Sequence, residues 1–209
     1  MPPGSSEAGR RLLLNRLYRR YADDPQFARV RAEAKKVLVP GDGPMNPRLM
    51  IIGEAPGARE AQLRKPFVGA SGEFLAEMMA SVGLEREEVF ITNVVKYRPW
   101  NNRDPEHDER LAGLAYLRSE HQLLGRPPMV LLGSHARKTL RGPLEGHPIG
   151  HWLWMSWDGG YPLLPLHHPA FGIYKRSNRP MMMQQFRAVL HVPRRAEEVE
   201  SINADLPVS

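Results

Sequence analysis

The stretch Arg48-Leu-Met-Ile-Ile-Gly-Glu-Ala-Pro-Gly57 joins a short apolar run to a loop with two glycines, a proline and one carboxylate. An apolar run of this length that is bounded by turn residues predicts a strand buried on both faces of a parallel sheet. A rigid loop at the end of such a strand is a common place for functional side chains. Glu54 is therefore a candidate functional residue, and a simple polar turn residue is the alternative interpretation.

Three further apolar runs follow, and helical patterns lie between them. Strands that alternate with helices predict an α/β fold in which helices cover both faces of one sheet. Because crossovers between parallel strands are right-handed, we expect a three-layer αβα sandwich with a central, mostly parallel four-stranded sheet. The expected strands are Arg48–Ile52, Val89–Asn93, Pro128–Leu132 and Pro162–Leu166, and the expected helices are Ser71–Val82, Asp104–Leu124, Ser134–Leu140 and Arg179–Leu190.

The remaining segments suggest a division of the chain into four parts. Residues 1–9 are rich in proline, glycine and serine and predict a flexible arm. Residues 10–47 form a helical lead-in, with one helix over Arg10–Tyr21 and a second from Pro25 to about Leu38. Residues 48–192 form the α/β domain, in which the alternating segment His151–Trp157 predicts an extra hairpin or edge strand. Residues 193–209 form a charged tail that we expect to fray.

The composition limits the chemistry. The chain has no cysteine, which excludes disulfides, thiolate catalysis and clusters held by cysteine. Its 29 lysines and arginines exceed its 23 acidic residues by six, and arginine supplies 23 of the basic residues. The planar guanidinium group suits phosphate, so nucleic acid is a natural partner. No apolar run approaches the roughly 18 residues of a membrane span, and Met1–Ser6 lacks an apolar signal core, so we expect a cytoplasmic protein.

Polar residues stand directly after the four expected strands, namely Glu54, Asn93, Ser134 and His168. In open α/β sheets the ligand site lies beyond the carboxyl ends of the strands. We therefore expect four separate segments to meet in one cleft. The amide of Asn93 offers a donor and an acceptor together, which matches the imide edge of a pyrimidine such as uracil, although a turn asparagine is the simpler interpretation.

Two loops add candidate contacts to a nucleotide. In Lys65–Gly72 the ring of Phe67 could stack on a base, and the glycines and Ser71 could hold a phosphate; a core ring and an ordinary helix cap are the alternatives. In His167–Arg176 a histidine, apolar residues and cations stand together, which suits a wedge that enters the minor groove of DNA. Lys96, Arg98 and Arg103 could contact phosphates or form an ordinary solvated charge run.

Together these motifs resemble the uracil-DNA glycosylase superfamily, and within it the iron–sulfur class called family four. The resemblance covers roughly residues 48–190, in order and with the usual spacing. The segments that carry it are Gly53-Glu-Ala-Pro-Gly57, Arg64-Lys-Pro-Phe-Val-Gly-Ala-Ser-Gly72, Ile91-Thr-Asn-Val-Val-Lys-Tyr-Arg-Pro99, Asn102-Arg-Asp-Pro105, Leu131-Leu-Gly-Ser-His-Ala136 and His168-Pro-Ala170.

The resemblance implies a role for each matched residue. Glu54 would position the attacking water, Asn93 would read the edge of the flipped base, and His168 would donate to the base as negative charge develops on it. Phe67 would stack on that base, backbone groups around Ala55 and Gly57 would hold it, and Glu60 would lie near its C5 edge and exclude a methyl group. From the residues themselves, the expected DNA contacts are Ser71, Lys96, Arg98, Ser134, Phe171, Lys175 and Arg176.

The chain also departs from the family pattern. The four cysteines of the cluster are absent: the first two would fall where Tyr18 to Tyr21 has a similar spacing, the third is Tyr97, and the fourth would lie near Gly113. We expect aromatic packing around these tyrosines to take over as a staple. The acidic residue usual after Glu60 is Ala61, which puts the choice of substrate in question. Asn101–Arg103 is too short for the insertion of the uracil-crosslinking relatives, so we expect turnover and no lasting adduct.

The sequence thus predicts a monomeric DNA glycosylase that removes uracil from single- or double-stranded DNA and leaves an abasic site, as in base excision repair. We expect no cofactor, no metal and no membrane association, and we expect a nucleoid-associated protein of bacterial or phage origin. Two alternatives remain. One is a glycosylase of the same fold that excises a modified pyrimidine, for example in phage DNA. The other is a non-catalytic DNA-binding accessory protein.

Overall fold

The computed structural model describes residues 6–134, 147–156 and 159–206, and a five-stranded sheet forms its centre. The strand order is β2-β1-β3-β5-β4, in which the first four strands are parallel and β4 runs antiparallel to β5. The mostly parallel α/β sheet is therefore confirmed. The strands are β1 (Leu49–Gly53), β2 (Val89–Asn93), β3 (Met129–Leu132), β4 (Leu153–Met155) and β5 (Tyr161–Leu166).

The strand count is five and not four, because residues 153–155 join the sheet as an edge strand. Leu153 pairs with Leu163 and Met155 pairs with Tyr161, so the alternating segment around Trp154 does form the edge strand that its pattern suggested. The other four strands lie within one residue of their expected starts.

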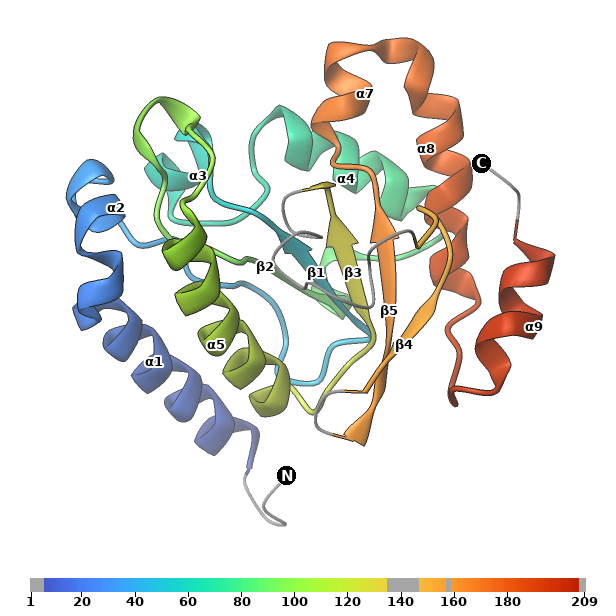
Figure 1. Ribbon diagram of the computed structural model, residues 1–209, viewed down its shortest axis with the longest axis horizontal. Helices are drawn as coiled ribbons and strands as arrows, with labels where there is room; N and C mark the ends of the chain where they lie inside the picture. The colour runs from blue at the N-terminus through green and yellow to red at the C-terminus, as the bar shows by residue number, and fades with distance from the viewer. Residues whose placement is uncertain (1–5, 135–146, 157–158, 207–209) are drawn as a thin grey trace.

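Helices cover both faces of this sheet (Figure 1). α1 (Glu7–Asp23) and α5 (His107–Leu123) cover one face, and α4 (Ala70–Ala80) and α8 (Arg179–Phe186) cover the other. Strand residues alternate between the two cores: Met50 and Ile52 pack toward α1 and α5, whereas Leu49 and Ile51 pack toward α4 and α8. This period of two is the expected consequence of strand geometry and completes the three-layer sandwich.

No helix among the described residues is long and apolar enough to cross a membrane.

Shorter elements connect these layers. The shorter elements are η1 (Pro25–Phe27), α2 (Ala28–Glu33), α3 (Ala58–Leu63), η2 (Arg86–Glu88), η3 (Trp100–Asn102), α7 (Ala170–Tyr174), η5 (Arg176–Asn178), η6 (Arg187–Leu190) and α9 (Glu198–Asp205).

The described residues near each end of the chain are more ordered than expected. α1 already begins at Glu7, because the side chain of Ser6 accepts a hydrogen bond from the backbone of Gly9 at 3.1 Å and caps the helix. The tail does not fray as predicted: α9 follows, and the side-chain amide of Asn203 exchanges two hydrogen bonds of 2.8 Å with the backbone of Trp152. Leu206 is buried at its end. The charged residues of the tail conceal an apolar face that packs on the core.

Two expected helices end differently or cannot be followed. The helix expected to reach about Leu38 ends at Glu33, because Lys35 and Lys36 have φ angles of 49° and 60°, which a right-handed helix does not contain. The short helix expected over Ser134–Leu140 lies outside the described residues except for Ser134, as do the first five residues of the expected arm.

A buried ion pair joins the helical lead-in to the strand that carries Asn93. The side chain of Lys96 is fully buried, and its ammonium nitrogen donates to Glu120 Oε2 at 2.7 Å, to Thr92 Oγ1 at 2.7 Å and to the backbone oxygen of Asn93 at 2.6 Å. The hydroxyl of Tyr18 in α1 donates to Glu120 Oε1 at 2.5 Å. The prediction that Lys96 contacts DNA is therefore wrong.

The path of the chain after β2 explains this burial. Val94 and Val95 donate backbone hydrogen bonds to Gly53 and Glu54, so the chain stays against β1 instead of leaving the edge of the sheet. Burial lowers the pKa of Lys96, and the charge of Glu120 opposes that change. An ammonium group has three N–H donors, and each of the three has an acceptor here. These hydrogen bonds offset the cost of burying the two charges in the core.

The pair predicts an asymmetric response to substitution. Lys96→Met should lower the free energy of unfolding by about 3–5 kcal/mol, because it leaves the Glu120 carboxylate buried without a counter-charge. Lys96→Met/Glu120→Gln should recover most of that loss, because the amide can still bond Tyr18 and Thr92. Urea unfolding of both variants measures this difference.

Arg29 provides the control, because it pairs with Glu33 and Glu106 but its side chain is 64% exposed. Arg29→Met should cost less than about 1 kcal/mol. Equal losses for Lys96→Met and Arg29→Met would contradict a buried, desolvated pair.

Candidate nucleotide-binding site

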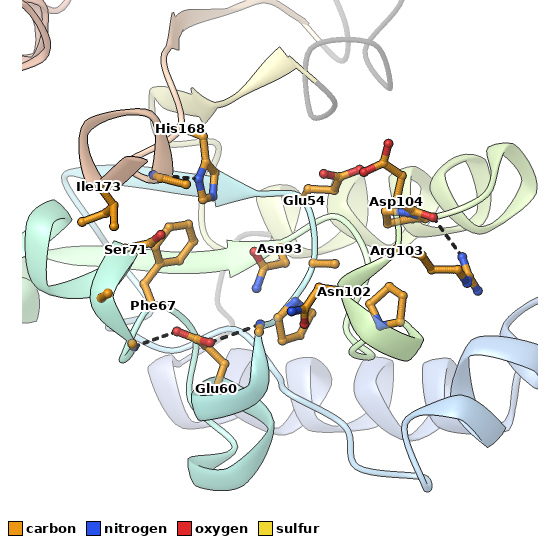
Figure 2. Close-up of a pocket in the computed structure, with 18 of the residues that line it drawn as sticks. Glu54, Glu60, Phe67, Ser71, Asn93, Asn102, Arg103, Asp104, His168 and Ile173 are labelled. Carbon is orange, nitrogen blue, oxygen red and sulfur yellow. Dashed lines mark hydrogen bonds between the residues drawn. The ribbon is translucent and has the colours of Figure 1, made fainter. Parts of the chain in front are cut away.

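A cavity of about 400 Å³ lies beyond the carboxyl ends of the strands. Five separate segments line it, and Figure 2 shows their side chains converging from different elements. The parallel register causes this, because Gly53 pairs with Asn93 and both strands therefore end at the same edge. The residues of the sequence prediction that line the cavity are Glu54, Ala55, Gly57, Glu60, Phe67, Ser71, Asn93 and His168.

Phe67 forms one wall of the cavity. Its ring is buried and lies 5.9 Å, centroid to centroid, from the ring of His168. The backbone of Phe67 has a φ angle of +52°, and Arg86 holds the loop by donating to the carbonyl of Pro66 at 2.8 Å. The ring is thus fixed as part of the cavity wall and does not belong to a loose loop.

Glycine at position 53 lets two functional side chains approach the strand end. A Cβ atom added at Gly53 would come within 2.5 Å of Asn93 Oδ1 and within 2.7 Å of the Phe67 ring. At Gly72 an added Cβ would lie 2.1 Å from the carbonyl oxygen of Phe67. These two glycines therefore make room for the amide and for the loop that carries the ring.

Asn93 is buried at the end of β2, and its amide lies in the middle of the site (Figure 2). Its backbone oxygen accepts the hydrogen bond from Lys96 described above. The buried ion pair therefore holds the residue that presents this amide, while the amide itself lines the cavity.

His168 follows β5 and is neutral near pH 7. Burial lowers its pKa from 6.5 to about 4, although the charge of Glu60 opposes this change. Its Nδ1 accepts a hydrogen bond from the backbone N–H of Ala170 at 3.2 Å, so in the neutral ring the proton resides on Nε2. The site therefore contains a neutral imidazole with one N–H donor.

Glu60 lines the cavity, but its carboxylate bonds to the backbone. Oε1 accepts from the N–H groups of Val68 at 3.0 Å and Gly69 at 2.8 Å, and Oε2 accepts from Gly57 at 3.1 Å. These bonds tie the loop after β1 to the loop that carries Phe67. This role could not be predicted, because the short helix α3 that contains Glu60 was not expected.

A second carboxylate lies near Glu54. Figure 2 shows Glu54 and Asp104 on the same side of the cavity, and both line it. The expected helix start at Asp104 is wrong, and the motif Asn102-Arg-Asp-Pro105 was the signal that could have identified this residue as part of the cavity. α5 in fact begins at His107, so Asp104 is left on the loop that faces the cavity.

Arg103 anchors this loop through two carboxylates. Its guanidinium bonds to Glu109 Oε1 at 2.8 Å and to Glu33 Oε1 at 3.1 Å. These hydrogen bonds, first with Glu109 and then with Glu33, raise the pKa of Arg103 above its usual value. Arg103 also lines the cavity, but because two carboxylates already neutralise it, the structure favours an anchoring role over a phosphate contact.

The remaining expected DNA contacts lie around the cavity. Ser71 is in the first turn of α4, and Ser134 is exposed just after β3. Arg98 is partly exposed and donates to Asn102 Oδ1 at 2.8 Å.

The segment after β5 presents exposed side chains. The ring of Phe171 in α7 stacks on the ring of His167, with the ring centroids 4.9 Å apart. Phe171, Lys175 and Arg176 are all exposed. Tyr174, which the sequence analysis did not single out, is 90% exposed and lines the cavity.

Aromatic rings pack where the resemblance places the cluster ligands. Tyr21 stacks on Phe27 at 3.9 Å and lies 5.7 Å from Tyr97 and 4.9 Å from Tyr116, measured between ring centroids. A Cβ atom added at Gly113 would come within 2.5 Å of the Val94 carbonyl oxygen. Because an iron–sulfur cluster needs thiolate ligands and the chain has none, these residues do not fit such a cluster.

Comparison with known proteins agrees with this geometry. A family model described as the Uracil DNA glycosylase superfamily matches residues 40–191. The type-4 uracil-DNA glycosylase of Saccharolobus solfataricus is 39% identical over 163 residues, which cover 74% of this chain and 76% of that protein. The enzymes of the same name from Sulfurisphaera tokodaii and Thermotoga maritima are 36% and 34% identical, over 72% and 68% of this chain and 72% and 74% of their own lengths. The chain belongs to the uracil-DNA glycosylase superfamily.

Proposed function

We propose that this protein hydrolyses the N-glycosidic bond of uracil in DNA and leaves an abasic site. The observation that carries the proposal is a cavity in which a neutral His168, the Asn93 amide and the Phe67 ring meet beside the carboxylate of Glu54. The names of the relatives described above support the same activity. A base inside a duplex cannot reach such a cavity, so the target nucleotide must flip out of the stack.

The cavity recognises the base by shape and by hydrogen bonds. The ring of Phe67 offers a stacking surface, and the Asn93 amide offers one donor and one acceptor group to the edge of the pyrimidine. Both are fixed before substrate arrives, Phe67 by its loop and Asn93 by Lys96, so little ordering is needed on binding. A base that cannot pair with the amide would leave it unsatisfied in a buried site, which disfavours that base.

Bond cleavage moves negative charge onto the departing base and positive charge onto the sugar. The Nε2–H of His168 is the donor for the base oxygen, and burial makes such a contact stronger than it would be in water. On the opposite side, the carboxylates of Glu54 and Asp104 are suited to orient the attacking water and to stabilise the sugar cation. The phosphates of the DNA also stabilise that cation.

The proposed enzyme needs no iron–sulfur cluster. The helical lead-in is held instead by the aromatic packing around Tyr21 and by the hydroxyl of Tyr18, which bonds to Glu120. The staple joins α1 and η1 to α5 and to the segment that follows β2.

A second candidate is the excision of a modified pyrimidine, and the position of Glu60 favours it. Both carboxylate oxygens of Glu60 bond to backbone N–H groups, so this side chain is already engaged and is not available to repel a substituent at C5. A binding protein without catalytic activity is the third candidate, and the presence of Glu54, Asn93 and His168 in one cavity argues against it.

Single-turnover cleavage of a uracil-containing oligonucleotide, followed by alkali, tests the proposal. His168→Ala should slow the reaction by about 10²–10³-fold, because one donor to the departing base is lost. Asn93→Ala should reduce both the rate and the preference for uracil over cytosine, because the two bases differ at the edge that the amide contacts. Glu54→Gln should slow the chemical step with little change in DNA affinity, because the carboxylate faces water and sugar.

His191→Ala is the matched control, because His191 is exposed and does not line the cavity. Unchanged rates in all three site variants would show that the cavity is not the active site. Cleavage restricted to oligonucleotides with a C5-modified pyrimidine would replace uracil by the second candidate, and binding without any cleavage would support the third.

The neutral state of His168 predicts a dependence of stability on pH. The unfolded histidine takes up a proton as the pH falls below 6.5, whereas the folded one does so only near pH 4. The contribution of the neutral ring is therefore complete above pH 6.5 and is lost as the pH falls toward 4, by up to about 3 kcal/mol. Urea unfolding at pH 7 and pH 4.5 should show a larger loss for the wild type than for His168→Gln. Equal losses would mean that His168 is not buried in its neutral form.

Iron content tests the absence of a cluster. The protein purified with or without oxygen should be colourless and should contain no stoichiometric iron, because no side chain supplies a thiolate. Absorbance in the visible range together with iron analysis measures this. Iron at one cluster per chain would contradict the proposal even if uracil excision were found.

A further inference from the structure

Among the described residues, Trp100 is the most exposed tryptophan, with 69% of its surface in contact with solvent. It lies on the segment between β2 and α5, which runs beside α2 and α3 (Figure 1). This segment is braced: the backbone N–H of Trp100 donates to Glu33 Oε2 at 3.0 Å, and Asn101 and Asn102 have φ angles of 52° and 53°. The ring is therefore presented to solvent by a fixed turn.

A groove of about 460 Å³ starts at this ring, and we name it the Trp100 groove. Its neighbour is the cavity described above, because Pro99 lines both and Asn102 on the same turn lines the cavity. The residues that line the groove include Ala34, Lys35, Val37, Arg98, Pro99 and Trp100. An exposed tryptophan alone needs no explanation, but a groove that continues the proposed DNA site does.

The charges of the groove favour an anionic ligand. Its only carboxylate among the described lining residues, Glu33, bonds to Arg29 and Arg103. Burial raises the pKa of Glu33, but the N–H of Trp100 and the Arg103 guanidinium lower this pKa by more than burial raises it. The carboxyl group is therefore ionised, and the arginines that it contacts balance its charge. Lys35 is exposed on the rim, and Arg98 donates to the neutral amide oxygen of Asn102, so neither side chain has a hydrogen bond to a carboxylate among the described residues of this groove.

We propose that the Trp100 groove binds the substrate strand next to the flipped nucleotide. The indole stacks on an adjacent unpaired base, and Lys35 and Arg98 contact the phosphates on either side of it. An aromatic ring between cations is the arrangement by which proteins hold single-stranded nucleic acid without reading its sequence. This inference rests on the proposed function, since it requires a DNA strand in the neighbouring cavity.

Stacking requires an unpaired base, so the groove gives the protein a preference for single-stranded DNA. Fluorescence anisotropy of the full chain with a labelled single-stranded oligonucleotide that lacks uracil measures this without any cleavage. Trp100→Ala should weaken binding between about 5-fold and 100-fold, Trp100→Phe should weaken it less, and the affinity for duplex should change little. Lys35→Ala and Arg98→Ala should each lower the salt slope by about one.

Leu111→Ala is the matched control, because Leu111 is an exposed leucine on α5 and does not line the cavity or the groove. It should leave the affinity unchanged. Thermal unfolding of every variant shows whether Trp100→Ala remains folded, which we expect for a side chain that is mostly in water.

The position of the stacked base can be found with uracil oligonucleotides that carry one abasic nucleotide at each neighbouring position in turn. One position should weaken binding to the wild type and have no further effect on Trp100→Ala. An unchanged affinity of Trp100→Ala for single strands, or equal effects at all positions, would overturn the groove as a DNA site and leave a protein partner as its occupant. Loss of affinity without any uracil excision would support the groove and refute only the proposed function.

Discussion

The buried ion pair between Lys96 and Glu120 is the interaction on which the rest of the structure depends. The ammonium group of Lys96 joins Glu120 in α5, Thr92 in β2 and the backbone of Asn93, and Glu120 in turn holds Tyr18 in α1. Removing two charges from water is costly, and the cost is offset only when every donor of the ammonium finds an acceptor. One helical layer and the end of β2, which carries Asn93, are thereby tied to a single buried network.

This arrangement gives the helical lead-in a purpose beyond covering the sheet. Tyr21 stacks on Phe27, contacts Tyr97 and Tyr116 with its ring, and accepts a hydrogen bond from the backbone of Lys96 at 2.8 Å. Aromatic pairs of this kind contribute beyond the area that they bury. The lead-in is therefore fastened directly to the segment that leaves Asn93. A scaffold that is rigid at this point can present an amide to a base with little cost of ordering.

The site separates binding from chemistry by the solvent exposure of its parts. Asn93 and Phe67 are buried and His168 is partly buried, so the amide and the neutral imidazole of the cavity have little contact with solvent. Around them stand exposed aromatic side chains, with Phe171 and Tyr174 in α7 and Trp100 in η3. The carboxylates lie between the two zones, because Glu54 and Asp104 line the cavity from loops and water can reach them there.

The sequence by itself determined the class of fold and most of the cavity. Short apolar runs and helical spacing are local signals, and Glu54, Asn93 and His168 stand at or just after strand ends, so their meeting at one edge could be predicted from the parallel sheet alone. Only the tertiary structure decided which charges are buried. Lys96 and Arg98 look alike in the sequence, yet the first is enclosed by α1 and α5 whereas the second remains near the surface.

The roles of Glu60, Asp104 and Trp100 were also decided by tertiary structure, because they depend on which backbone N–H groups, loops and grooves lie opposite. Contacts such as that between Tyr18 and Glu120, which are 102 residues apart, leave no periodic trace in the chain. Spacing reports the neighbours of a residue along one element, and it does not report what another element brings against it.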